Sequence, residues 1–180
     1  MAGLGHIAVG AAAARWLTRG EGGAARARVT AGLAVLAMLP DIDVIGFALG
    51  VPYGAPFGHR GASHSLSVAL LTGACAGFLL SRGGARPWAR ALPLAIAVAL
   101  SHGLLDAMTD GGLGVALLWP FTAARFFLPW NPIPVAPIGA GMFSARGLHV
   151  TVVEALEFAP LLVYALWPAR ASGAPAVGGR

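Results

Sequence analysis

The chain has 180 residues, of which 57% are hydrophobic and 11% are charged, and its mean hydropathy is +0.75. A soluble domain carries roughly a quarter charged residues, so this composition is typical of a membrane protein and excludes a disordered or collagen-like chain. The net charge of +5 comes from arginines that lie between apolar segments, which favours membrane topology over nucleic-acid binding. A single cysteine, Cys75, cannot form an internal disulfide.

Apolar segments along the chain predict an all-α, polytopic membrane bundle with about four to five hydrophobic helices. Most of these segments approach the roughly 20 residues that cross a bilayer, and the first is short. The stretch 113–128 is broken by Pro120, and 129–147 contains four prolines and is expected to be irregular. We expect one membrane-embedded domain over 1–170 and a flexible cytoplasmic tail at 171–180. The predicted helices cover about 3–17, 29–50, 65–81, 90–108 and 150–167.

The arginines predict the orientation of these helices. If the segments alternate in direction, nine of the twelve arginines fall on one side: Arg15 at the end of the first helix and eight in connectors 18–28 and 82–90 and in the C-terminal tail. Short loops rich in arginine face the cytoplasm. The N-terminus and the loops 51–64 and 109–149 are therefore expected to face outward.

Ionisable side chains inside apolar segments are costly and usually functional. A helix rises about 1.5 Å per residue, which places His6, Asp41 and His102 roughly 16–18 Å from the inner ends of their helices. Several segments therefore present acids or imidazoles at a similar depth in the outer half of the membrane. The candidate metal ligands are His6, Asp41, Asp43, His59, His64, His102 and Asp106.

His102 and Asp106 are four residues apart, so they share one helical face and offer one nitrogen and one oxygen to a metal. The same spacing is equally consistent with a buried His–Asp hydrogen bond that holds two helices together. Pro40 is expected to break or kink its helix at 39–43, where Asp41 and Asp43 then need cations in hydrocarbon. The alternative is a solvated loop at the interface.

The stretch GHRGASHS at 58–65 places two histidines around an arginine. Neutral imidazole is a common ligand of zinc, and the guanidinium fork of Arg60 matches a phosphate. Ser63 is the expected N-cap of the next helix. Loop histidines beside an arginine that binds lipid headgroups are the alternative.

The number of candidate ligands exceeds what one zinc ion needs, since a structural zinc takes four ligands and a catalytic zinc takes three and a water. The set predicts a binuclear site for divalent metal, with two zinc ions and manganese as the alternative. Two metals about 4 Å apart can activate water and stabilise both oxygens in phosphoester hydrolysis.

At these residues the sequence resembles the YdjM-like family of inner-membrane metal-dependent hydrolases. The matching stretches are GHIAVG (5–10), LPDID (39–43), GHRGASHS (58–65), HGLLDAMTDGG (102–112) and LLWPF (117–121). The family commonly has Thr where this chain has Ser63, which retains the hydroxyl. The resemblance implies a multi-pass protein of the bacterial inner membrane whose metal ligands fall on the seven residues above. The same set also looks like the zinc phospholipase C and P1 nuclease group, which suggests a phosphodiester substrate.

The sequence thus predicts a membrane-embedded metal-dependent hydrolase of a phosphoester on a phospholipid or lipid-linked substrate. Arg60 is expected to bind the phosphate. Asp43 or Asp106 is expected to act as a metal ligand or as the general base. No nucleic-acid partner is expected, and nothing specifies an oligomer. One alternative is a metal or ion carrier that uses the same residues, although no repeat symmetry supports it. Others are a structural protein with a vestigial site and a histidine phosphatase, whose required arginine is replaced by Ile96.

Overall fold

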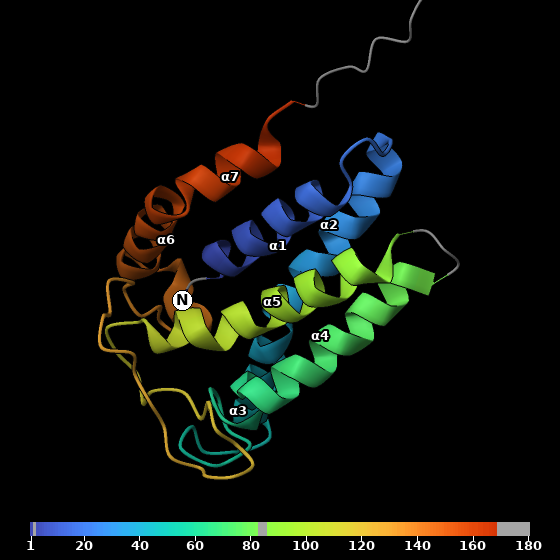
Figure 1. Ribbon diagram of the computed structural model, residues 1–180. Coiled ribbons are helices and arrows are strands. Elements are labelled where there is room, and N and C mark those ends of the chain that lie inside the picture. The colour runs from blue at the N-terminus through green and yellow to red at the C-terminus, as the bar shows by residue number, and fades with distance from the viewer. Residues whose placement is uncertain (2, 83–85, 169–180) are drawn as a thin grey trace, which may run out of the picture.

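The computed structural model describes residues 1, 3–82 and 86–168, which form helices joined by irregular segments (Figure 1). These residues contain isolated β-bridges but no β-strand, which confirms the predicted all-α class. The predicted tail at 171–180 lies outside the described residues. The longer helices are α1 (Leu4–Leu17), α2 (Gly23–Met38), α4 (Leu66–Ser81), α5 (Trp88–Ala107), α6 (Ala145–Glu157) and α7 (Ala159–Leu166). The short ones are η1 (Leu39–Val44), α3 (Ile45–Ala48), η2 (Ala62–His64) and η4 (Gly139–Phe143).

Within the described part of the chain, two helical segments are long and apolar enough to cross a bilayer. They are Gly23–Ala48 with 26 residues, which is α2 continued through η1 and α3, and Trp88–Ala107 with 20. Helices α6 and α7 meet at a bend of 68° and give a third span if the pair crosses as one unit. The predicted count of four to five is therefore high. Helices α1 and α4 have 14 and 16 residues, short of the roughly 20 that the hydrocarbon core requires.

Helices α4 and α5 pack together through glycines. A Cβ atom on Gly73 would lie 2.6 Å from Ile96 Cα, and one on Gly77 would lie 2.6 Å from Leu92 Cα. Only glycine permits this spacing. Packing and lipid entropy, rather than the hydrophobic effect, drive helix association in lipid, so small residues gather at such contacts. Large side chains such as Phe78, which is 64% exposed, point outward as lipid-facing residues do.

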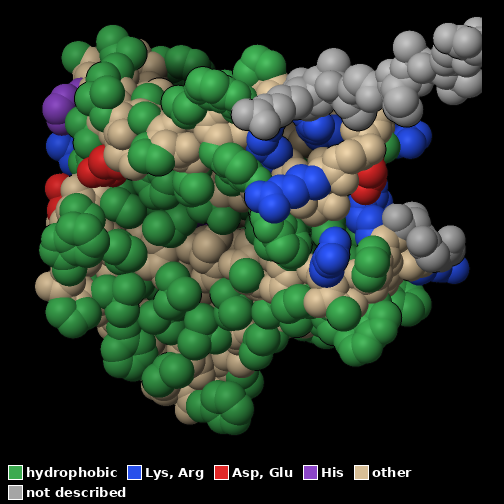
Figure 2. All heavy atoms as spheres, turned by 45° about the horizontal axis from the view of Figure 1, so that its top comes forward, with side chains coloured by type: hydrophobic (Ala, Val, Ile, Leu, Met, Phe, Trp, Pro, Cys, Tyr) green, Lys and Arg blue, Asp and Glu red, His purple; other side chains and the backbone are tan. Residues whose placement is uncertain are grey.

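Helices α1, α2, α4 and α5 alternate in direction, which places alternate connectors at opposite ends of the bundle (Figure 1). The two ends differ in their chemistry. One end contains the connectors from α1 to α2 and from α4 to α5, which an ion pair of 2.5 Å between Glu21 and Arg86 joins. Figure 2 shows most of the visible basic side chains gathered at one end of a largely apolar face. The start of α1 and the end of α5 lie at the other end. The arginines of the basic end are Arg15, Arg19, Arg26, Arg28, Arg82, Arg86 and Arg90.

Candidate metal centre

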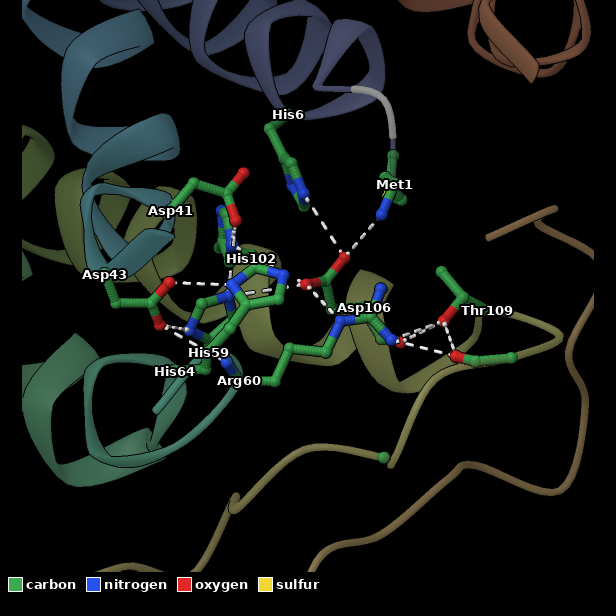
Figure 3. Close-up of polar contacts among 12 residues, drawn as sticks. Met1, His6, Asp41, Asp43, His59, Arg60, His64, His102, Asp106 and Thr109 are labelled. Carbon is green, nitrogen blue, oxygen red and sulfur yellow. Dashed lines mark hydrogen bonds and ion pairs between the residues drawn. The ribbon is translucent and has the colours of Figure 1, made fainter. Parts of the chain in front are cut away.

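The structure brings the predicted ligands together at the end of the bundle opposite these arginines (Figure 3). They come from four regions of the chain that are far apart in sequence. His6 lies on the first turn of α1, Asp41 and Asp43 lie on η1, and the remaining residues come from the α3–α4 connector and from α5. We call this set the His/Asp cluster; it consists of His6, Asp41, Asp43, His59, His64, His102 and Asp106.

Local features of each element direct these side chains toward one another. The α-helical pattern of α2 ends at Met38, and the tighter 3-10 turn that carries both aspartates begins at Leu39 with Pro40 as its second residue. At the start of α1, the amide of Gly5 donates a hydrogen bond of 3.2 Å to the carboxylate of Glu154 on α6. This contact binds one of the free amides of the first helical turn and anchors the turn that carries His6.

Four residues of the cluster surround one point at distances that suit a metal ion. Asp41, His64, His102 and Asp106 each offer one ligand atom, and these atoms lie within 4.8 Å of one another. Asp41 Oδ1 lies 3.5 Å from Nε2 of both His64 and His102, and Asp106 Oδ2 lies 3.4 Å and 3.8 Å from the same two nitrogens. Oxygen and imidazole nitrogen together form a typical ligand set for a divalent transition metal.

The imidazole nitrogens at this point lack hydrogen-bond partners. Nε2 of His6, His64 and His102 is buried without one, although buried polar atoms are almost always paired. Nδ1 of His102 lies 2.6 Å from the carbonyl oxygen of Ala37, which can only accept, so Nδ1 carries the proton and Nε2 keeps its lone pair. The ring of His6 stacks on that of His102 with centroids 3.8 Å apart. This donor set fits a metal ion.

Asp43 lies beside the group of four possible ligands and accepts several hydrogen bonds. Its carboxylate lies 2.7 Å from Nδ1 of His59 and 3.1 Å from Nδ1 of His64, and it accepts from the Ser63 hydroxyl at 2.6 Å and from the Arg60 amide at 3.2 Å. Asp43, His59 and His64 form a second group that could hold an ion. The expectation that Ser63 caps α4 is wrong, because the Ser65 side chain accepts from the amide of the third helical residue instead.

Arg60 is 2% exposed and joins the cluster to the loop after α5. Its Nε lies 3.2 Å from Asp106 Oδ2, and a terminal nitrogen donates to Thr109 Oγ1 at 2.9 Å and to the Gly111 carbonyl at 3.1 Å. The backbone of Arg60 has a φ of 60°, a left-handed conformation that is costly outside glycine and is often found at functional sites. Its guanidinium thus already has partners in the protein.

The electrostatics of the cluster favour positive charge at its centre. His64 lies in η2, within the connector between α3 and α4. Burial lowers the pKa of its ring, but the carboxylates of Asp106, Asp41 and Asp43 outweigh burial and raise the pKa to about 10. The N-terminal ammonium group of Met1 also lies 2.9 Å from Asp106 Oδ1.

Three residues of the cluster, Asp41, His59 and Asp106, lie with Arg60 at the floor of a cavity of about 550 Å³ at the end of the bundle. These four residues contribute polar groups to its lining. Another part of the lining comes from the irregular segment 135–138 and from η4 and is largely apolar. The cavity therefore offers a polar floor and an apolar wall to a bound molecule.

Sequence analysis did not single out two residues that line or support this cavity. Tyr53 lines it beside His59, with ring centroids 5.3 Å apart. Arg125 donates to the carbonyl oxygens of His59, Tyr53 and Ala55 at 2.9–3.1 Å, and so fixes the loop that carries His59. The only sequence signal was an arginine within an apolar, proline-rich stretch, which gives no indication of these long-range contacts.

The fold and the cluster define an all-helical membrane protein with a buried His/Asp site able to hold a metal ion. The chain belongs to the YdjM inner membrane protein family, whose model matches residues 1–173. It is also 41% identical over 143 residues to the inner membrane protein YbcI of Escherichia coli K12, which covers 74% of this chain and 79% of that protein. No solved structure matches the chain, and the likeness to zinc phospholipases C stays a prediction.

Proposed function

We propose that this protein is a membrane-embedded, metal-dependent hydrolase that cleaves phosphoester bonds of phospholipid or lipid-linked substrates. The observation that carries the proposal is the convergence of three buried, unpaired imidazole Nε2 atoms on the carboxylates of Asp41 and Asp106. Burying this many polar atoms without partners costs several kcal/mol in total, at roughly 1–3 kcal/mol for each group. A divalent cation between the two carboxylates would satisfy Nε2 of His64 and of His102.

The ligands of this ion would be Asp41, His64, His102 and Asp106, with His6 beside them. A bound divalent cation would lower the pKa of water and stabilise negative charge on a phosphoester oxygen. We propose that the site binds two zinc ions, with manganese as the alternative metal. A second ion would need the group of Asp43, His59 and His64, and would compete with their present hydrogen bonds.

We assign Asp43 a positioning role rather than that of the base. A carboxylate that accepts from Nδ1 of a metal-binding histidine fixes the ring and raises the basicity of Nε2, and Asp43 stands in this relation to His64. Asp43 also lies 2.7 Å from Nδ1 of His59, which lines the cavity, and a neutral His59 held in this way would present Nε2 as the base that takes a proton from water. Asp106 would act as a ligand.

Arg60 would act on the substrate through its position at the floor of the cavity. Its ion pair with Asp106 orients that carboxylate, and Arg60 lines the cavity in which a phosphoryl group would bind. The apolar side chains of Val135 and Ile138 line the same cavity and suit the hydrocarbon part of a lipid. An anionic amphiphile therefore matches the cavity better than a soluble phosphate.

We further propose that the site faces the outer side of the inner membrane. The proposal follows from the arginines, because short basic connectors stay in the cytoplasm and the cluster lies at the other end of the bundle. Substrate would then reach the cavity from the outer leaflet.

Metal content of the detergent-purified protein, measured by inductively coupled plasma mass spectrometry, tests the proposal. We expect one or two zinc or manganese ions per chain, and their loss in His102→Ala and in Asp106→Ala. His149→Ala is the matched control, since this histidine is exposed on α6 outside the cluster. Metal retained equally in all three variants, or absent from the metal-supplemented wild type, would contradict a metal centre.

Hydrolysis is tested separately on phosphodiester lipids in mixed micelles. The wild type and His149→Ala should release product, and His102→Ala should not. Metal binding without any hydrolysis, together with rapid exchange and passage of metal across proteoliposomes, would favour the ion carrier instead.

A further inference from the structure

A second cavity lies at the basic end of the bundle, away from the His/Asp cluster. It has a volume of about 420 Å³ and lies between the start of α2 and the end of α4. We call it the basic cavity. Its lining consists of Glu21, Ala25, Arg28, Val29, Leu79, Leu80, Arg82 and Arg86.

The charges around the basic cavity are unbalanced. Arg86 is paired with Glu21 at 2.5 Å, so this arginine is neutralised within the protein. Among the described residues, neither Arg28 nor Arg82 has a hydrogen bond or ion pair from its side chain, and Arg82 only lies over the ring of Phe78 at 6.0 Å. Three guanidinium groups and one carboxylate leave a net charge of +2 around one cavity. An anion is the complementary ligand.

The apolar residues of the lining indicate that the anion also has an apolar part. Val29 is buried, whereas Leu79 is 63% exposed on the surface of α4 that faces the bilayer. The cavity thus joins two cationic side chains to apolar surface at a membrane boundary. Basic pockets between helices at the cytoplasmic interface are a known setting for anionic lipid headgroups, since guanidinium pairs with phosphate in a bidentate manner.

We infer that the basic cavity is a binding site for an anionic phospholipid of the inner leaflet. The phosphodiester group lies between Arg28 and Arg82, and an acyl chain follows Leu79 along α4. Arg86, held by Glu21, closes the side of the cavity nearest the α1–α2 connector. The site is independent of the metal centre, because it lies at the other end of the bundle and shares no residue with the cluster.

Native mass spectrometry of the detergent-purified full chain tests this site with phosphatidylglycerol, phosphatidylcholine and inorganic phosphate as probes. We expect phosphatidylglycerol to bind selectively and Arg28→Gln/Arg82→Gln to weaken its binding by about 25-fold, since each basic residue at an anionic surface contributes about a fivefold gain. The matched control is Arg19→Gln/Arg90→Gln, which removes the same charge from the same end but lies outside the cavity. The control should bind nearly as the wild type does.

A variant of opposite sign provides an independent test. Glu21→Gln raises the net charge around the cavity and should tighten phosphatidylglycerol binding by roughly fivefold. Equal weakening by both arginine pairs would overturn the proposal in favour of a diffuse basic surface. Equal binding of phosphatidylcholine, or tight binding of inorganic phosphate without lipid, would also overturn it. Metal content is expected to stay unchanged in all of these variants.

Discussion

Gly103 sets the distance between α5 and His64, so its replacement tests whether the metal centre depends on this spacing. A Cβ atom at Gly103 would lie 2.4 Å from the carbonyl oxygen of His64 and 3.4 Å from Leu117 Cδ2. A carbon–oxygen contact is normally at least about 3.3 Å, so Gly103→Ala must move the two segments apart by roughly 1 Å. The obstacle is main chain, which cannot rotate away as a side chain can.

The consequences of this shift for stability and for metal binding can be separated. Overpacking costs about 1–3 kcal/mol, and the better helix propensity of alanine returns up to about 1 kcal/mol. We therefore expect a modest loss, about 2–6 °C in Tm. Metal–ligand distances tolerate only about 0.2 Å, so a displaced His64 should weaken zinc binding at least about tenfold.

Two glycines serve as controls for Gly103→Ala. Gly77→Ala meets Leu92 Cα at 2.6 Å near the basic end and should lower Tm without changing zinc affinity. Gly32→Ala on α2 meets nothing within 4 Å and should leave Tm equal or higher. Thermal unfolding and competition with a chelator of known affinity measure the two effects. Wild-type zinc affinity in a destabilised Gly103→Ala would refute the argument.

Three further predictions concern other residues. Asp43→Asn should weaken zinc binding about 10–100-fold in a protein that still folds, and chelator competition that finds no change would remove its positioning role. Glu154→Ala leaves the first turn of α1 without its buried carboxylate and should cost about 1.5–3 kcal/mol, so an unchanged Tm would contradict that role. For topology, Phe57→Cys and Arg90→Cys are placed separately in a Cys75→Ser background, where an impermeant reagent applied from outside should label only the first. Equal labelling would refute the orientation.

The sequence by itself indicated the class of the protein and the residues that gather in the cluster. The low charge content and the apolar segments of a chain reflect the solvent that surrounds it. They therefore predict a membrane bundle before any contact between residues is known. The common depth was also predicted from local information, because the rise per residue is fixed and a count from the expected helix ends places His6, Asp41 and His102 at a similar level. The expected count of membrane-crossing helices was high because hydropathy does not report where a helix bends or ends.

Only the tertiary structure decided which atoms of the cluster face one another. Depth along a helix does not specify which nitrogen of His64 faces Asp43 and which faces Asp106, because this depends on how η2 is placed against α5. The support of the site is likewise non-local, since Glu154 and Arg125 act through contacts across 149 and up to 72 residues of chain. Spacing in sequence predicts contacts within one helix, and packing between helices decides the rest.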